Sequence, residues 1–317
     1  MTISKNIKTI PITNKQDWLE NRLLDVTSTE ISCLFNCNPY LTEFELYHQK
    51  KDKVVVNLED TERMAWGRKL EDSIALGCAE SQGWKVEQMD VYMSDSQGMG
   101  SSFDYKITSE KELGIMEVKN VSEYIYKTKW IEENDNLEAP PHIEMQLQYQ
   151  LHVADINWGC IAALVGGNTQ KLIIRERNRE MGKRFDAVVK EFWDRVKSGT
   201  PPPTNYERDS NYMIKNLFNH ADSSLIMNAD AEMDQLVKDY HAVNKEFASL
   251  SKTKDSIKAQ ILEKSQGASK IISEYGTINC GMTKASQGKY ITEDMVGTFI
   301  NQRKSFRQFK YNQPKGV

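Results

Sequence analysis

The segment SSFDYKITSEKELGIMEVKNVS, residues 101–122, decides the fold because charged residues interrupt two predicted β-strands. Asp104 stands at the end of the first strand, and Glu117-Val118-Lys119 lies within the second. Alternate side chains of a strand share a face, so we expect Glu117 and Lys119 to point one way and Val118 into the core. If the two strands pair, Asp104 lies beside Glu117.

Two carboxylates that converge in this way form an oxygen-rich site suited to Mg²⁺ or Mn²⁺. Such an ion lowers the pKa of a bound water and offsets charge on a phosphoryl oxygen. Lys119 would hold or deprotonate the attacking water, or neutralise a developing oxyanion. The alternative is a buried Glu117–Lys119 ion pair with a purely structural role, since buried charges are costly unless they are paired or bound to metal.

Composition limits the class of protein. The 317 residues carry a formal net charge of −4, which argues against a protein that coats nucleic acid by bulk attraction. A nuclease remains compatible, because local acidic ligands and a local basic track can cancel in the sum. No stretch approaches the ~20 apolar residues of a membrane span, and no secretory signal is present. The five cysteines are scattered, as in a reducing compartment, so we expect a cytoplasmic protein.

Hydrophobic periodicity around this segment predicts an α/β chain with a mixed central sheet flanked by helices. Helices are predicted at 17–22, 27–35, 42–51, 61–83, 143–153 and 178–197. Strands are predicted at 84–94, 101–109 and 114–122, forming a meander, and then at 158–167 and 170–178. The run SGTPPPT at 198–204 marks a boundary, so we expect one domain over 1–205.

Residues 206–317 are expected to form a mostly helical extension. Apolar residues at 229–265 recur at alternating intervals of three and four, interrupted by Lys254, which predicts one heptad-like helix or a hairpin of two. That helix would pack on its own protein or serve as an arm for a partner. A terminal hairpin is predicted at 275–292, and a basic, aromatic tail at 301–313.

At this point the chain resembles a family. Five segments occur in the order of the YqaJ-type viral recombinase family, which includes the phage lambda exonuclease and belongs to the PD-(D/E)XK nucleases. The segments are RLLDVTSTEISCLFNCNPY, MAWGRKLEDSIA, SSFDY, GIMEVKN and IEMQLQYQLHV, followed by a strand ending in VGG. The resemblance covers roughly residues 20–200 and implies a restriction-endonuclease-like core. Phe103 and Tyr105 stand where the family usually has Pro and Gly around the metal-binding Asp, and Thr29 stands where serine is common.

The resemblance also implies roles for single residues. The implied metal ligands are Asp104, Glu117, Glu71 and the backbone carbonyl of Val118. The implied catalytic set is Lys119, Glu117, Asp104 and Gln146, with Gln148 and Tyr149 as neighbouring substrate contacts. The implied 5′-phosphate site is Arg22, with Thr29 and Ser102 as hydroxyl donors. Without the resemblance, Glu71, Gln146 and Arg22 would be interpreted as ordinary surface polar residues.

The function implied by the resemblance is digestion of one strand of duplex DNA from its 5′ end with two divalent ions. Mononucleotides would be released, and the 3′ tail would pass to a single-strand annealing protein for recombination. The resemblance further implies a toroidal homotrimer, acting in a bacterial or phage-infected cell. The alternatives are a structure- or sequence-specific endonuclease of the same fold and a non-catalytic DNA-binding or assembly factor. An iron–sulfur nuclease is disfavoured, because only Cys280 lies in the C-terminal third.

Overall fold

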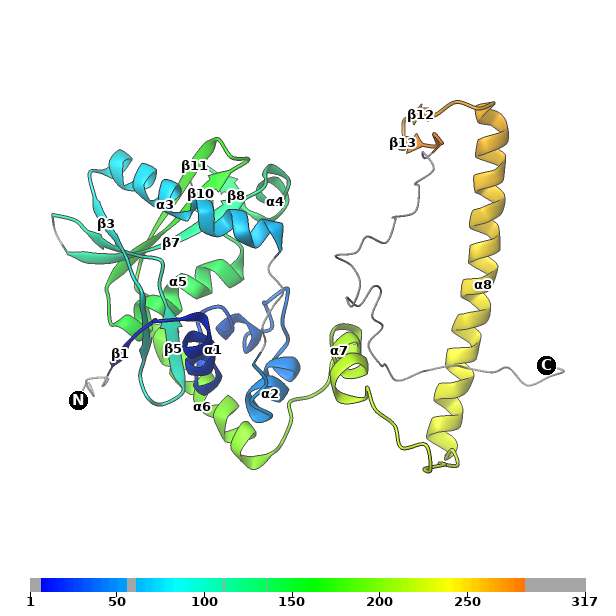
Figure 1. Ribbon diagram of the computed structural model, residues 1–317, viewed down its shortest axis with the longest axis horizontal. Helices are drawn as coiled ribbons and strands as arrows, with labels where there is room; N and C mark the ends of the chain where they lie inside the picture. Colours follow the sequence, from blue (N-terminus) through cyan, green and yellow to red (C-terminus); the bar gives the residue numbers. More distant parts are fainter. Residues whose placement is uncertain (1–6, 56–60, 111, 135, 283–317) are drawn as a thin grey trace, which may run out of the picture. The chain divides into compact units, whose positions relative to one another are not determined.

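The computed structural model describes residues 7–55, 61–110, 112–134 and 136–282. The chain divides into two compact units, Met1–Tyr212 and Met213–Val317, which are described separately. Strands and helices are mixed in the first unit, and one long helix dominates the described part of the second (Figure 1). The α/β fold class predicted from the sequence is therefore confirmed for the first unit.

The central element of the first unit is a five-stranded sheet of order β11-β10-β7-β6-β3. Its strands are β3 (Lys85–Gln88), β6 (Tyr105–Thr108), β7 (Leu113–Val121), β10 (Trp158–Val165) and β11 (Thr169–Glu176). β7 and β10 run parallel, whereas every other neighbouring pair is antiparallel. The sheet is mixed, as predicted, and β7 lies in the middle of it.

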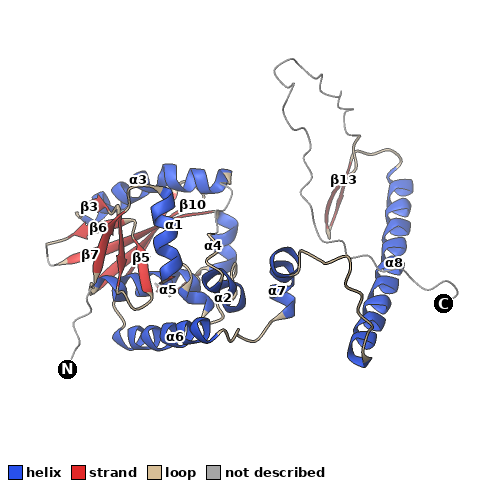
Figure 2. Ribbon diagram, turned by 60° about the horizontal axis from the view of Figure 1, so that its bottom comes forward, coloured by secondary structure: helices blue, strands red, loops and turns tan. Residues whose placement is uncertain are grey.

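Helices cover both faces of this sheet (Figure 2). α3 (Glu62–Gln82) buries Ile74 and Cys78 in the same core cluster as Met116 and Val118 of β7. On the other face, α5 (Pro141–Ala154) buries Leu147 with Ile115 of β7. Alternate residues of β7 therefore face different helices, which confirms that Val118 points into the core and leaves Glu117 on the α5 side.

A second sheet, of order β1-β4-β5-β2, corrects the predicted meander. Its strands are β1 (Lys8–Pro11), β2 (Val26–Thr27), β4 (Val91–Ser94) and β5 (Met99–Ser102). The strands predicted at 84–94 and 101–109 each divide in two, so that β3 and β6 stay in the central sheet while β4 and β5 leave it. Met89 N–H donates to the Asp104 carbonyl at 3.0 Å, and buried Phe103 packs in the same cluster as Met89, which holds the corner.

Shorter elements surround the two sheets. They are α1 (Lys15–Leu24), a 3-10 turn at Ile31–Cys33, α2 (Glu43–Lys51), α4 (Glu123–Lys129), the hairpin of β8 (Ile131–Glu133) and β9 (Asn136–Glu138), and α6 (Arg179–Ser198). The helix predicted at 27–35 is shorter than expected. Its first residue, Thr27, belongs to β2, and the side chain of Glu30 accepts from Thr27 N–H at 2.9 Å, which fixes a turn there.

The boundary expected after residue 205 lies further along the chain. α7 (Tyr206–Tyr212) belongs to the first unit, because Asp209 is 1% exposed and accepts a 2.6 Å hydrogen bond from Thr42 Oγ1. Arg208 also donates to the Asn38 carbonyl at 2.5 Å. The composition signal SGTPPPT marks the end of α6 rather than the end of the unit.

The second unit contains a short π-helical turn at Met213–Leu217 and then α8 (Ala231–Ser265), a single continuous helix rather than a hairpin of two. β12 (Lys270–Ser273) and β13 (Gly276–Asn279) pair as a hairpin. The predicted hairpin at 275–292 therefore begins earlier than expected, and its part beyond 282 lies outside the described residues, as does the tail at 301–313. Within the described ranges no helix is long and apolar enough to cross a bilayer.

Close packing between β10 and β7 gives a stability test. A Cβ atom on Gly159 would lie 2.7 Å from the backbone carbonyl of Ile115, which cannot move without breaking the sheet. We expect Gly159→Ala to lower the free energy of unfolding by about 1–3 kcal/mol. Gly77→Ala on α3 is the control, because its nearest atom is 3.9 Å away and alanine favours a helix, so stability should stay level or rise. Equal effects in urea denaturation would contradict this packing.

Candidate active site

Glu117 is the centre of the candidate site. Its side chain is almost fully buried, at 2% exposure. One carboxylate oxygen accepts from Lys119 Nζ and from Gln146 Nε2, the latter at 2.6 Å. The other oxygen accepts from Gln150 Nε2 at 2.7 Å. Both oxygens of a buried carboxylate are thus occupied by donors, which offsets the cost of removing its charge from water.

The repeat of a β-strand and the repeat of an α-helix together bring these side chains into one cluster. Glu117 and Lys119 are two residues apart on β7, so they share its α5 face. Gln146 and Gln150 are four residues apart on α5, so they share the helix face that meets β7. Gln146 Oε1 also accepts from Lys119 Nζ at 3.3 Å. The structure therefore brings together Glu117, Lys119 and Gln146 as predicted.

Sequence reasoning missed Gln150 and instead predicted substrate contacts for its neighbours Gln148 and Tyr149. Gln148 donates to the Glu176 carbonyl at 2.9 Å and accepts from Asn178 N–H at 2.8 Å, which joins α5 to the start of α6. Tyr149 has no exposed surface, and its hydroxyl donates to the Val26 carbonyl at 2.6 Å. Because these side chains lie on other faces of α5, the substrate contacts expected for Gln148 and Tyr149 are corrected to structural roles.

Asp104 lies at the corner between the two sheets, and its Oδ2 accepts from Val118 N–H at 2.8 Å. Burial and then the neighbouring Glu117 charge raise its pKa well above the ordinary range. Glu71, on α3, has its pKa raised by burial and then by Glu117. Burial alone would lower the pKa of Lys119, but Glu117 and Asp104 outweigh it and raise that pKa. Three carboxylates therefore share one region with the Lys119 ammonium among them.

The chemistry of this group suits a hard cation. The charge of Glu117 raises the pKa of both Asp104 and Glu71, and a divalent ion would relieve that repulsion with the oxygen ligands that Mg²⁺ and Mn²⁺ prefer. Gln150 Oε1 is buried and accepts from no donor among the described residues. As the side chains stand, with Lys119 on Glu117, no three His, Cys, Asp or Glu residues in the described ranges form a ready-made metal site.

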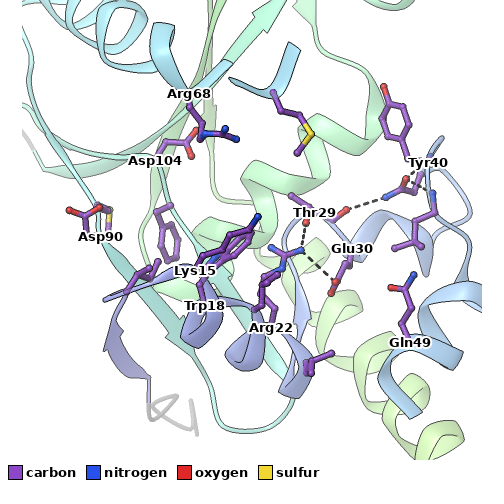
Figure 3. Close-up of a pocket in the computed structure, with 18 of the residues that line it drawn as sticks. Lys15, Trp18, Arg22, Thr29, Glu30, Tyr40, Gln49, Arg68, Asp90 and Asp104 are labelled. Carbon is purple, nitrogen blue, oxygen red and sulfur yellow. Dashed lines mark hydrogen bonds and ion pairs between the residues drawn. The ribbon is translucent and has the colours of Figure 1, made fainter. Parts of the chain in front are cut away.

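A cavity of about 980 Å³ adjoins the carboxylates (Figure 3). Its lining includes Glu71 and Asp104, and also Arg22 and Thr29. Figure 3 shows Asp104 on one side, Tyr40 on the other, and Arg22 with Thr29 between them. One cavity is thus lined by two of the carboxylates predicted to bind metal and by two of the residues predicted to hold a phosphate. Ser102 is not among the described lining residues, and its carbonyl accepts from Gln150 Nε2 at 3.3 Å.

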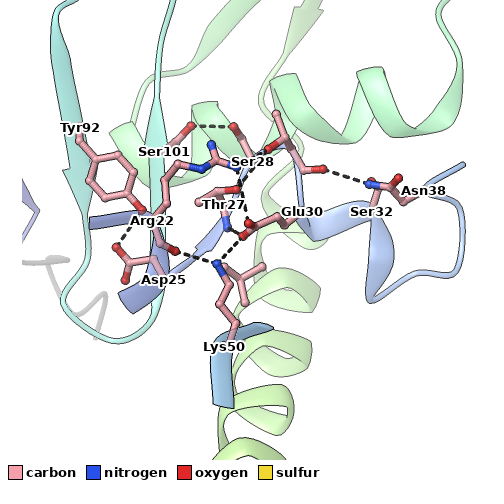
Figure 4. A network of polar contacts seen from close by, with 12 residues as sticks. Arg22, Asp25, Thr27, Ser28, Glu30, Ser32, Asn38, Lys50, Tyr92 and Ser101 are labelled. Atoms are coloured by element: carbon pink, nitrogen blue, oxygen red, sulfur yellow. Dashed lines mark hydrogen bonds and ion pairs between the residues drawn. The ribbon is translucent and has the colours of Figure 1, made fainter. Parts of the chain in front are cut away.

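Arg22 is held in place from several sides (Figure 4). Its Nη2 donates to Thr29 Oγ1 at 3.1 Å and lies 3.5 Å from Glu30 Oε1. The guanidinium carbon is 4.8 Å from the centre of the Trp18 ring, within cation–π range. A planar cation that is fixed beside a hydroxyl suits a phosphate group that carries several acceptor oxygens.

The Glu30 carboxylate and Lys50 together hold the segment that carries Arg22. Lys50 Nζ lies 2.8 Å from Glu30 Oε2 and donates to the Arg22 carbonyl at 2.7 Å. Burial would raise the pKa of Glu30, but the charges of Lys50 and Arg22 outweigh it and lower that pKa. Sequence reasoning missed Glu30 and Lys50, since neither spacing nor composition shows that Arg22 and Lys50, 28 positions apart, meet around one buried carboxylate.

The pKa of Asp25, in the same network, is shifted in the opposite direction from that of Glu30. Its Oδ2 accepts from Tyr92 Oη at 3.1 Å, and burial raises its pKa to about 6. The Asp25 carboxyl group therefore binds its proton more tightly in the folded protein than in the unfolded chain. The stabilisation from Asp25 is complete below its ordinary pKa of 3.8 and is lost as pH rises through about 6.

An Asp25→Asn variant tests this titration. Asparagine stays neutral, so the free energy of unfolding of the variant, relative to the natural protein, should rise by up to about 3 kcal/mol between about pH 4 and about pH 8. Urea denaturation of both proteins at the two pH values measures this difference. A stability difference that is the same at both pH values would show that Asp25 has an ordinary pKa.

Comparison with known proteins adds to this geometry. Residues 17–157 match the family model of the YqaJ-like viral recombinase domain. Over 273 residues the chain is 24% identical to a Bacillus subtilis (strain 168) protein named "Uncharacterized protein YqaJ", covering 84% of this chain and 81% of that protein.

Among solved structures, the alkaline exonuclease LHK-Exo from Laribacter hongkongensis is 16% identical with a TM-score of 0.42, covering 59% of this chain and 94% of that one. LHK-Exo in complex with dAMP gives 15% identity and a TM-score of 0.43 over the same shares. The match of residues 17–157, together with the YqaJ relative, agrees with the resemblance identified from the sequence motifs: this part of the chain is similar to the YqaJ-like viral recombinase domain.

Proposed function

We propose that this protein is a metal-dependent exonuclease that digests one strand of duplex DNA from its 5′ end. One observation carries the proposal: a single cavity is lined both by carboxylates, Asp104 and Glu71, and by the fixed Arg22–Thr29 pair. An enzyme that cuts close to a 5′ end needs groups for the scissile bond and groups for the terminal phosphate within reach of each other. The YqaJ-like domain supports a recombination context for that activity.

We propose two Mg²⁺ or Mn²⁺ ions per site. The oxygen donors around the buried Glu117–Lys119 pair would hold them: Asp104, Glu117, Glu71 and the Val118 carbonyl. When bound, they supply a nucleophilic water at neutral pH and offset charge on phosphoryl oxygens.

Lys119 acts as a cation in this scheme. Glu117 and Asp104 raise its pKa, so the lysine is a cation when no ion is bound to these carboxylates. A protonated lysine can orient a water molecule and offset the charge that develops on the phosphoryl oxygens. An ion bound to the same carboxylates would offset their negative charge and lower the Lys119 pKa, so the general-base role is kept as the alternative.

Gln146 and Gln150 position Glu117 for this work. Each amide donates to a different oxygen of the carboxylate, at 2.6 and 2.7 Å, so the carboxylate group cannot rotate freely. Groups that are fixed before the reaction need no reorganisation during it, which is the main source of electrostatic stabilisation in enzymes. α5 therefore serves the reaction through two amides one helical turn apart.

Arg22 and Thr29 would bind the 5′-terminal phosphate, and this contact would set the polarity of digestion. The released products would be mononucleotides, leaving a 3′ single-stranded tail for an annealing protein. A homotrimer that encloses the duplex would keep the enzyme on its substrate between cuts. An endonuclease of the same fold would instead cut without a free end.

The catalytic pair is tested with Glu117→Gln and Lys119→Met. Each variant should lower the cleavage rate by about 10²–10³-fold or more, because each removes a charge at the reacting phosphate. Linear duplex labelled at either end, with Mg²⁺ supplied, measures the rate and the polarity, and a chelator should abolish cleavage. Lys127→Met, on an exposed helix, is the control.

Three results would contradict this account. They are full activity in both variants, equal cutting of circular and linear duplex, or release of label from the 3′ end first. Retained DNA binding in the inactive variants would separate loss of chemistry from loss of affinity. That result would also argue against a non-catalytic binding factor.

Arg22→Ala tests recognition of the 5′ end. Loss of a charged hydrogen-bond partner costs about 1.5–3 kcal/mol, so cleavage of a 5′-phosphorylated end should fall by about 10- to 100-fold. Cleavage of a 5′-hydroxyl end should change little. Arg179→Ala, at the exposed start of α6, is the matched control. An unchanged preference for the 5′ phosphate in Arg22→Ala would remove Arg22 from this role.

A further inference from the structure

Tyr40 projects from the wall of the cavity. It lines the cavity, yet its side chain is strongly exposed, at 82%. The surrounding loop is fixed, because the backbone N–H groups of Tyr40 and Leu41 both donate to Asn38 Oδ1, at 2.8 and 3.0 Å. Asn38 Nδ2 in turn donates to the Thr29 carbonyl at 3.1 Å. An open aromatic ring is therefore held rigidly on the segment that carries Thr29.

The ring also lies near the catalytic helix. Its centroid is 5.9 Å from that of His142, and the two planes are nearly perpendicular, at 87°. His142 is in the first turn of α5, one turn before Gln146. Burial and then the Lys119 charge lower the pKa of His142, so this imidazole lies within the electrostatic reach of the catalytic lysine. Tyr40 thus lies on a loop tied to the Thr29 segment, with its ring next to the first turn of α5.

Other aromatic side chains around the cavity are already occupied. The Arg22 guanidinium covers the Trp18 ring at 4.8 Å, and Phe103 is only 4% exposed. Trp66 is not among the described lining residues, and Lys69 Nζ lies 5.0 Å from its ring centre. Among the described aromatic residues of the cavity wall, Tyr40 offers the most accessible ring face.

We propose that Tyr40 stacks on a nucleobase within the first two nucleotides of the strand being digested. This inference rests on the proposed function. Every base has an aromatic face, so stacking would hold the strand end without selecting its sequence, as an exonuclease requires. Arg22 would hold the phosphate and Tyr40 the base, which together would orient the backbone towards Asp104.

The test compares Tyr40→Ala with Tyr40→Phe, which keeps the ring. Substrates are 5′-phosphorylated duplexes that carry either normal bases or an abasic site at the first or second nucleotide. We expect Tyr40→Ala to raise KM about tenfold on the normal duplex and Tyr40→Phe to leave KM nearly unchanged. One of the two abasic positions should abolish the difference between Tyr40→Ala and the natural protein. Tyr124→Ala, 74% exposed on α4 and outside the cavity lining, is the matched control.

A second readout does not require cleavage. 2-Aminopurine at the first or second nucleotide should be quenched on binding, without divalent ion, by the natural protein and by Tyr40→Phe but not by Tyr40→Ala. An equal KM for Tyr40→Ala and the natural protein, or an equal loss on normal and abasic ends, would overturn the stacking role. Absence of cleavage by the natural protein would overturn the proposed function instead, and the quenching would still decide whether Tyr40 binds a base.

Discussion

A buried carboxylate held by three donors is the interaction on which the rest of this site depends. Glu117 lies at the middle of the central sheet, where an unpaired charge would be strongly unfavourable. Lys119 supplies the opposite charge, and Gln146 and Gln150 supply the remaining hydrogen bonds. These contacts join β7 to α5. The interactions that offset the cost of burying the Glu117 charge therefore also fix the proposed catalytic groups.

The corner between the two sheets adds the second acid. Strands that would otherwise run straight through the central sheet leave it after β3 and before β6, and Asp104 stands at that bend. Its carboxylate caps the backbone N–H of Val118, which ties the bend to β7 beside Glu117. The cavity borders the same corner, because its lining includes Phe103 and Asp104 of the bend together with Trp18 and Arg22 of α1.

Local periodicity was sufficient to predict much of this arrangement. The alternation of β7 predicted that Glu117 and Lys119 share a face, and the helices and strands of the first unit occur near their expected positions. The same rule, applied to α5, selects Gln146 and Gln150, whereas the sequence motif drew attention to Gln148 and Tyr149, which face elsewhere. For Gln148 the error was avoidable, since residues two apart on a helix point in nearly opposite directions, whereas the burial of Tyr149 against Val26 depends on tertiary packing.

Other features could not be predicted from local pattern. The division of two predicted strands at Met89 and Phe103 depends on burial of Phe103 in a core built from distant segments. The meeting of Arg22, Glu30 and Lys50 depends on how α1 and α2 pack. In the described part of the second unit, α8 confirms a continuous helix, but its apolar seam carries no information about what it contacts.

The central claim is that Asp104 and Glu117 share a divalent cation with Lys119 beside them. Anomalous diffraction from crystals grown with Mn²⁺ and a 5′-phosphorylated duplex end measures this most directly. The account predicts an anomalous peak at bonding distance from both carboxylates, with Arg22 on the terminal phosphate. A peak elsewhere, or none while Lys119 remains on Glu117 and the DNA end is bound, would contradict it.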